Sequence, residues 1–280
     1  MIASRRPATR DQPSRPDTAS HDAWRPSQSP DTRNAPIIVL TYKHSGAARL
    51  QSLLALHPQL VCTSGTGVLP LCEQAAAAWR EVDGTTGALS ALAVSSIRAL
   101  TSTLIGAILS FERNRRWCET TWAAPESAET FLQLFHGTRI LCLHRAFPMV
   151  VYDAVHSSPW GLEGGATVAP FIRAYPASTL KALTAYWLAR TKPLLAFEQA
   201  HPGICRRVRY EDLSGGSSED LFSFLGLDNI SNDMTTRPAH EPRPHELAPS
   251  LPLGQIPPAM LEQANDLMRD LGYAPACLRK

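Results

Sequence analysis

The sequence lacks the residue patterns that mark a metal site or a disulfide-stabilised fold. It has six cysteines, and these form no CxxC pair and do not stand at the Cys/His spacing of zinc ligands. We therefore expect no metal ion and no disulfide framework, and we expect most of the thiols to be buried and free.

A strong net charge and a long apolar run are missing as well. The formal net charge is only +2, and the six arginines and four aspartates that precede Pro36 account for all of it. The rest of the chain is near neutral, which disfavours a nucleic-acid partner and favours a small anionic ligand held by a few local cations.

The longest apolar run, residues 99–111, is shorter than the ~20 residues that a bilayer requires, so we expect no membrane partner. The segment after Met1 has no apolar core of a signal peptide, and the expected localisation is cytoplasmic.

Composition divides the chain into two parts at Pro36. Residues 1–35 are rich in Pro, Ser, Arg and Asp and hold few aliphatic side chains, which predicts a disordered leader. Residues 36–280 are predicted to form one domain, because a chain of 280 residues with 44% hydrophobic content can bury a full core. The sequence leaves a homodimer open.

Short apolar runs alternate with longer amphipathic segments throughout the predicted domain. The apolar runs are continuous, as in the strands of a parallel sheet that is covered on both faces. This pattern predicts an α/β fold with a mostly parallel sheet and helices on both faces, whose ligand binds at the carboxyl ends of the strands. The expected strands cover residues 37–40, 60–62, 116–119, 139–143 and 204–210, and the main expected helices begin near residues 45 and 148 or cover residues 70–79, 89–111, 126–135, 178–199 and 219–225.

The turn after the first expected strand is the most informative segment. Two basic side chains, Lys43 and His44, follow the strand directly, and a helix is expected to begin near Ser45. The first N–H groups of a helix have no partner within it and point, with the positive end of the helix dipole, at whatever lies in the turn. The turn therefore predicts a phosphate or sulfate site. It is not a nucleoside triphosphate P-loop, because the pattern GxxxxGK[ST] is absent.

Four segments together resemble the PAPS-dependent sulfotransferases. Residues 117–121 are similar to the family's W-x-E-K-T, residues 139–148 to its strand ending in V-R-D-P, and residues 208–213 to its R-Y-E-D-L strand end. In the turn, Ser45-Gly46 is similar to the S-G of the family's phosphosulfate loop, P-[RK]-S-G-T-T. The resemblance implies the P-loop NTPase-like sulfotransferase fold. It also implies transfer of a sulfuryl group from PAPS (3′-phosphoadenosine 5′-phosphosulfate) to a hydroxyl or amine of a small-molecule acceptor, with PAP as the product.

The resemblance also implies roles for single residues. Arg145 inherits the contact with the 3′-phosphate of PAPS, and Tyr210 inherits the place beside the adenine. Protonated His44 would donate a hydrogen bond to the bridging oxygen, as the family's Lys or Arg does. The remaining residues expected around the phosphosulfate are Lys43, Ser45, Gly46, Ala47 and Ala48, of which the two alanines replace the hydroxyl residues of the family.

Asp153 is the largest departure from the family pattern. Relatives have a serine eight residues after the phosphate-binding arginine, and its hydroxyl donates to the 3′-phosphate, whereas the count from Arg145 leads to Asp153. An ionised carboxylate at that position would repel the phosphate. The departures leave an alternative open, a sulfotransferase-like protein that has lost sulfuryl transfer and serves as a binding module or catalyses another reaction.

A general base must accept the proton of the acceptor, and the sequence offers two candidates. Glu119 ends an expected strand at the edge of the sheet where ligands bind. His156 lies about one helical turn beyond Asp153 on the helix expected to begin near residue 148. The sequence does not decide between them.

Overall fold

The computed structural model describes residues 35–110, 112, 115–156, 166–214, 218–228 and 251–276. Residues 1–34 of the expected leader lie outside this part of the chain, so the leader remains a prediction.

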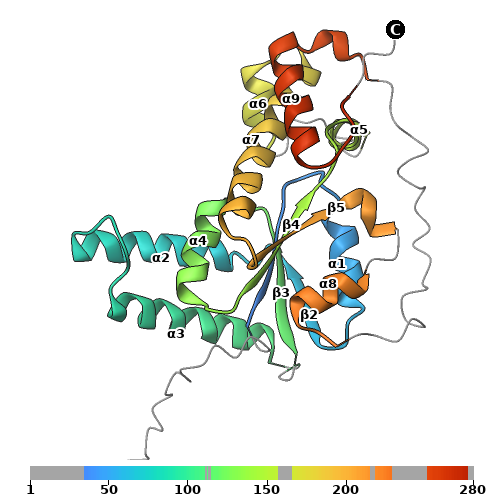
Figure 1. Ribbon diagram of the computed structural model, residues 1–280. Helices are drawn as coiled ribbons and strands as arrows, with labels where there is room; N and C mark the ends of the chain where they lie inside the picture. The colour runs from blue at the N-terminus through green and yellow to red at the C-terminus, as the bar shows by residue number, and fades with distance from the viewer. Residues whose placement is uncertain are drawn as a thin grey trace, which may run out of the picture.

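Five parallel strands form one sheet at the centre of the described structure (Figure 1). The strands are β1 (Ile37–Leu40), β2 (Leu60–Ser64), β3 (Arg116–Thr121), β4 (Arg139–His144) and β5 (Cys205–Arg209), and their order is β2-β3-β1-β4-β5. Every pair of neighbouring strands is parallel, which confirms the predicted sheet. Because β1 lies between β3 and β4, the segments that follow these three strands leave the same edge of the sheet side by side.

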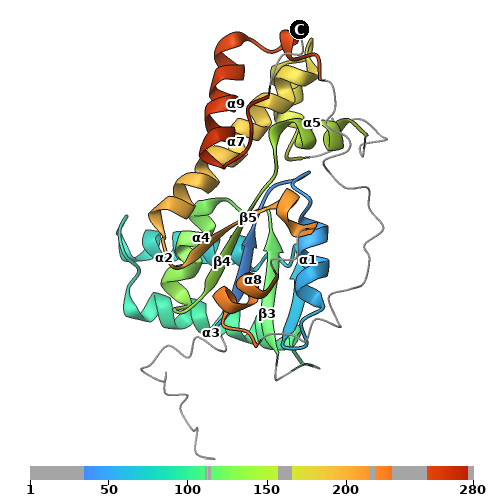
Figure 2. The same ribbon diagram turned by 45° about the vertical axis from the view of Figure 1, so that its right-hand side comes forward.

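Helices cover both faces of the sheet, as the continuous apolar strands predicted (Figure 2). Within β1, Ile38 and Leu40 belong to one core cluster, and Ile37 and Val39 belong to the other, because successive side chains of a strand point to opposite faces. Helices α1 and α8 pack on the second cluster, while α2, α4 and α7 pack on the first. The described helices are α1 (Ala47–Ala55), α2 (Val68–Asp83), α3 (Ala91–Ile108), α4 (Pro125–Leu134), α5 (Phe147–His156), α6 (Ala169–Ala174), α7 (Thr179–Ala200), α8 (Ser218–Leu225) and α9 (Pro258–Asp270), with short 3₁₀ segments at Tyr210–Ser214 and Leu253–Gln255.

Helix α3 is rich in apolar residues but also contains Arg98 and several serines and threonines. Its 18 residues have a mean hydropathy of 1.5, so by length and composition α3 is a candidate membrane span, although the apolar run marked in the sequence was too short. Such a helix is weak evidence for a membrane, because core helices of soluble proteins share these properties. Here α3 packs against α2 and α4.

The first helix begins two residues later than the sequence predicted. Gly46 is the N-cap of α1, and its φ of 84° lies in the left-handed region that glycine adopts without strain. Ser45 stays outside the helix because its hydroxyl is buried and hydrogen-bonded to the Thr41 hydroxyl. The turn is therefore braced from within, and the N-terminus of α1 follows directly after it.

Candidate functional site

The turn between β1 and α1 has the geometry of an anion-binding loop. His44 has a φ of 70° and is the only described non-glycine residue with a positive φ, and Gly46 follows with a second left-handed conformation. No side chain caps α1, and its first turn holds no acidic residue. The first-turn amides, at Ala47 and Ala48, therefore remain available to an anion at the positive end of the helix dipole.

Gly46 is covered by the ring of Tyr210. A Cβ atom built on Gly46 would lie 2.1 Å from Cδ2 of that ring, a separation that no side chain tolerates. The Tyr210 ring is buried, and the guanidinium carbon of Arg145 lies 4.2 Å from its centroid, a cation–π distance. Tyr210 thus lies at the site, as the resemblance implies, but its ring packs on the loop instead of standing open for a base.

Arg145 is held in place through its backbone. The hydroxyl of Tyr42 accepts a hydrogen bond from the Arg145 amide at 3.2 Å, and Trp187 Nε1 donates to the Arg145 carbonyl at 3.1 Å. Burial raises the pKa of the Tyr42 hydroxyl, so it stays protonated near neutral pH. The Arg145 side chain is 8% exposed, and its Nη1 donates to the His44 carbonyl at 2.9 Å, which ties the end of β4 to the loop after β1.

Two buried nitrogen atoms at this site have no hydrogen-bond partner among the described residues. They are Nε2 of His44, whose side chain is 5% exposed, and Nε of Arg145. A buried polar group without a partner costs about 1–3 kcal/mol, so such groups in a native structure are usually satisfied by a ligand or water. Nε of Arg145 is a donor and suits an oxygen of a phosphate or sulfate, and Nε2 of His44 becomes a donor when both ring nitrogens carry a proton. The loop therefore has the chemistry of an anion site.

Asp153 on α5 contacts two basic side chains, those of His44 and Arg145. Its Oδ2 lies 2.9 Å from Nδ1 of His44, and its Oδ1 lies 3.6 Å from Nη1 of Arg145. Because a carboxylate accepts, we assign the proton at Nδ1 of His44 to this hydrogen bond. The structure thus brings His44 together with Arg145 and Asp153, two predicted site residues that follow it by about a hundred positions in the chain.

Lys43 occupies the same loop, half-buried, and its carbonyl accepts a hydrogen bond from the Tyr186 hydroxyl at 3.1 Å. Burial raises the pKa of Tyr186, which keeps that hydroxyl a donor. Tyr186 comes from α7, so this helix fixes the loop from the side opposite to α1.

The two candidate bases lie in different surroundings. Glu119 is 1% exposed, and its carboxylate accepts hydrogen bonds from the Thr63 hydroxyl at 2.5 Å and from the Thr66 amide at 2.8 Å. His156 ends α5 in an exposed position, where its Nδ1 bonds the carbonyl of Tyr152 at 2.7 Å. Within the described part of the chain, neither residue hydrogen-bonds to His44, Arg145 or Asp153.

Glu211 follows Tyr210 in the R-Y-E-D segment and was not among the predicted site residues. Its Oε1 accepts from the Ala146 amide at the start of α5 at 3.1 Å, and its Oε2 accepts from the Tyr273 hydroxyl at 2.8 Å. Glu211 therefore joins the end of β5, the start of α5 and the segment after α9. An acidic residue directly after an expected strand was the available signal.

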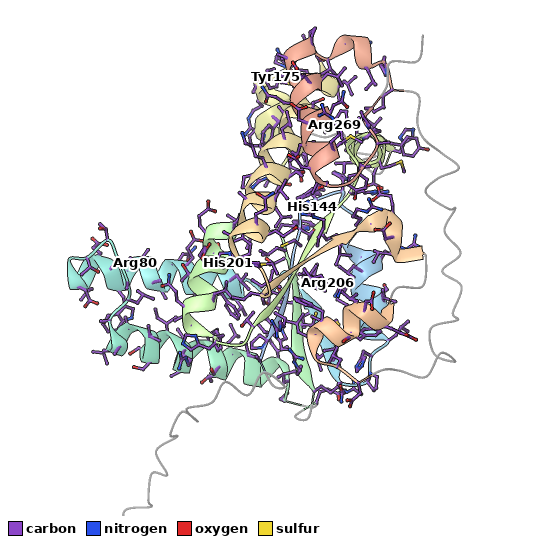
Figure 3. All side chains as sticks on the ribbon, in the orientation of Figure 1. Arg80, His144, Tyr175, His201, Arg206 and Arg269 are labelled. Atoms are coloured by element: carbon purple, nitrogen blue, oxygen red, sulfur yellow. The ribbon has the colours of Figure 1, made fainter. Side chains whose placement is uncertain are left out.

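His144 was also missed, although it precedes Arg145 directly. Figure 3 shows it where β4 meets α7. Its Nε2 lies 3.1 Å from Oε2 of Glu198, which also binds Arg207, and burial lowers the pKa of His144. The sequence carried no signal for this contact, because Glu198 comes from a helix more than fifty residues further along the chain.

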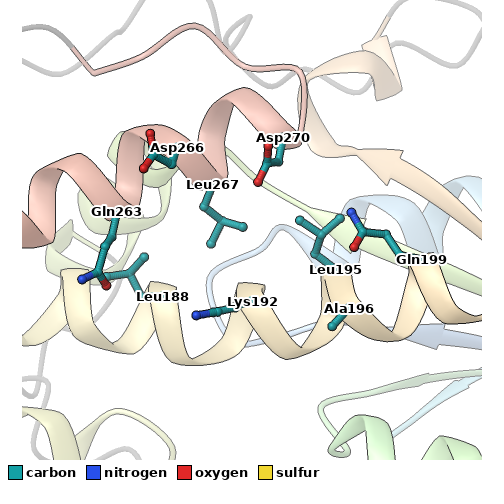
Figure 4. Close-up of a pocket in the computed structure, with 9 residues that line it drawn as sticks. All are labelled: Leu188, Lys192, Leu195, Ala196, Gln199, Gln263, Asp266, Leu267 and Asp270. Atoms are coloured by element: carbon teal, nitrogen blue, oxygen red, sulfur yellow. The ribbon is translucent and has the colours of Figure 1, made fainter.

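A separate cavity of about 390 Å³ lies between α7 and α9 (Figure 4). Leu188 and Leu267 form its apolar part, and Lys192, Asp266 and Asp270 form its charged part. None of the loop residues or their partners lines it. This cavity is therefore distinct from the site at the edge of the sheet.

Comparisons with known proteins agree with this geometry. Residues 36–230 match the family model described as "Sulfotransferase family". No curated protein sequence matches the chain. Among solved structures, a sulfotransferase domain from the curacin biosynthetic pathway is 17% identical, with a TM-score of 0.58 over 86% of this chain and 99% of that domain. The sulfotransferase domain of the Synechococcus PCC 7002 olefin synthase is 16% identical, with a TM-score of 0.52 over 88% of this chain and 98% of that domain.

The two structural similarities establish the fold, since both identities are low. The family match covers more than half of the chain and includes the loop after β1, Arg145 and the R-Y-E-D segment. The protein therefore belongs to the sulfotransferase family.

Proposed function

We propose that the protein transfers a sulfuryl group from an adenosine phosphosulfate to a hydroxyl or amine of a small-molecule acceptor. PAPS is the form of the donor that the resemblance implies, with PAP as its product. The observation that carries the proposal is that Nε2 of His44 and Nε of Arg145 are buried without a hydrogen-bond partner among the described residues, beside the N-terminus of α1. We place the enzyme in the cytoplasm, as a monomer or homodimer without a nucleic-acid or membrane partner.

The transfer breaks the S–O bond to the 5′-phosphate and forms a bond between the sulfur and the acceptor. Negative charge builds on the departing phosphate, and preorganised donors aimed at that charge lower the barrier. The Lys43 ammonium, the first-turn amides of α1 and a protonated His44 are the donors that the loop offers. Arg145 anchors the nucleotide beside them.

The proton of the acceptor passes to a general base, for which Glu119 and His156 are the candidates. Glu119 was expected to end its strand, but β3 continues to Thr121 and Glu119 lies inside it, level with Ile38 of β1. Each of its oxygens keeps a second lone pair beyond the bond it accepts. We favour Glu119 over the exposed His156 because it is buried in the sheet that carries the loop.

The test measures equilibrium unfolding of the full chain with PAP and with adenosine 5′-phosphate, which share the 5′ end that the loop would bind. Ligand at ~100 times its dissociation constant should raise the free energy of unfolding by about 2.7 kcal/mol. Arg145→Ala should remove most of this gain, whereas the control Arg206→Ala, whose side chain is 38% exposed and lies near Asp220, should keep it. The proposal is refuted if neither nucleotide stabilises the wild-type protein.

Binding without transfer would favour the alternative, a module that has lost catalysis. A panel of phenol, alcohol and amine acceptors with sulfur-labelled donor separates the two. Glu119→Gln should abolish transfer to any acceptor that reacts, while nucleotide binding stays intact.

A further inference from the structure

The carboxylate of Asp153 lies beside the basic side chains of His44 and Arg145. Its Oδ2 lies 2.9 Å from His44 Nδ1, and its Oδ1 lies 3.6 Å from Arg145 Nη1. The two basic side chains are almost fully buried, whereas the Asp153 side chain is 36% exposed. An anion that approaches Arg145 from solvent therefore passes close to a negative charge that belongs to the chain.

Several contacts hold Arg145 beside Asp153. Its Nη1 is bound to the His44 carbonyl, its guanidinium lies over the Tyr210 ring, and its backbone is bonded to Tyr42 and Trp187. A phosphate on the ribose would have to bind where the guanidinium already faces a carboxylate. Like charges brought together in a partly buried site repel strongly, because screening by water is weak there.

A carboxylate in this position suits a different group. Hydroxyl groups donate hydrogen bonds, and an ionised carboxylate only accepts them. Nucleotide sites use this difference elsewhere: an acidic side chain recognises a free ribose hydroxyl, and an arginine accommodates a phosphate at the same position. Here the acidic side chain is Asp153, which is more exposed to solvent than Arg145.

We propose that Asp153 sets the donor of this enzyme, so that the site prefers adenosine 5′-phosphosulfate, whose ribose 3′-hydroxyl is free, over PAPS. This inference rests on the proposed function and names the form of its donor. In this reaction the sulfuryl group passes from the 5′-phosphate to the acceptor oxygen or nitrogen, and adenosine 5′-phosphate is released. The proton of the acceptor goes to the general base.

Titration calorimetry of the full chain with the two desulfated products, adenosine 5′-phosphate and PAP, tests the inference without an acceptor. The wild-type protein should bind adenosine 5′-phosphate about 10-fold or more tightly than PAP. Asp153→Ser should improve PAP binding by about 10- to 100-fold and change adenosine 5′-phosphate binding much less. Asp153→Asn, which keeps the shape and removes the charge, should shift the preference in the same direction.

Asp266→Asn serves as the matched control, because it removes one negative charge from an exposed position on α9 and should leave the preference unchanged. Thermal melts of all variants establish that each is folded before titration. A wild-type preference for PAP that Asp153→Ser leaves unaltered would overturn the inference while the proposed function stands. Absence of binding by both nucleotides in every variant would instead overturn the proposed function, and the inference with it.

Discussion

Alanine at Gly46 should destabilise the protein through two separate effects. The first is conformational, because the φ of Gly46 is 84° and a left-handed conformation costs a residue with a Cβ about 1–2 kcal/mol. The second is steric, because the new Cβ would lie 2.1 and 2.2 Å from two atoms of the Tyr210 ring. Overpacking of this kind costs about 1–3 kcal/mol, so the two effects together lower the free energy of unfolding by about 2–5 kcal/mol.

Urea-induced unfolding, followed by tryptophan fluorescence, measures this loss, and the chain supplies a matched control. Gly65 also has a positive φ, 65°, but nothing lies within 4 Å of a Cβ built there. Gly65→Ala should therefore show only the conformational cost of about 1–2 kcal/mol. The difference between the two variants isolates the contact between the loop and Tyr210.

A double-mutant cycle completes the test. In a Tyr210→Ala background the obstacle is gone, and Gly46→Ala should cost no more than Gly65→Ala does. Equal losses for Gly46→Ala and Gly65→Ala in the wild-type background would show that the Tyr210 ring does not pack on the loop. The placement of Arg145 over that ring would then also be wrong.

Two further predictions concern groups around the loop. Tyr42→Phe removes the acceptor of the buried Arg145 amide and should lower the free energy of unfolding by about 1–3 kcal/mol in the same urea assay, whereas an unchanged midpoint would contradict the hydrogen bond at 3.2 Å. Burial lowers the pKa of His144 in the folded chain below its ordinary value of ~6.5. As the pH falls through ~6.5, the unfolded chain therefore binds a proton at His144 before the folded chain does. The free energy of unfolding should therefore fall as the pH drops below ~6.5, by at most ~1.4 kcal/mol per pH unit from this group, and a His144→Gln curve as steep as the wild-type curve would refute this assignment.

Local patterns in the sequence predicted most of the fold. All five expected strands were found. Strands β1 and β4 are nearly continuous apolar runs, as strands covered on both faces need, whereas β5 at the edge of the sheet carries three arginines. The expected helices were also found, although their ends shifted by a few residues, and the short α6 was not anticipated. A helix end depends on local backbone conformation, such as the left-handed N-cap at Gly46, which apolar periodicity does not reveal.

The family motifs predicted positions for the site but not the contacts of their side chains. Tyr210 was expected to be near the donor, and the structure adds that its ring closes over Gly46. Glu211 carries the hydrogen bonds that join three segments, although no role was expected for it. Side-chain partners of this kind depend on which elements are neighbours in space.

The sequence alone determined the α/β class, the loop after the first strand and the likeness to sulfotransferases, because each depends on residues close together in the chain. Only the tertiary structure decided that Asp153 binds His44 and Arg145. That contact requires β1 to lie beside β4 and α5 to follow β4 over the loop, and such an arrangement is set by packing between distant segments. The sequence predicted only that the Asp153 carboxylate would repel a phosphate, whereas in the folded chain it also contacts the side chains of His44 and Arg145.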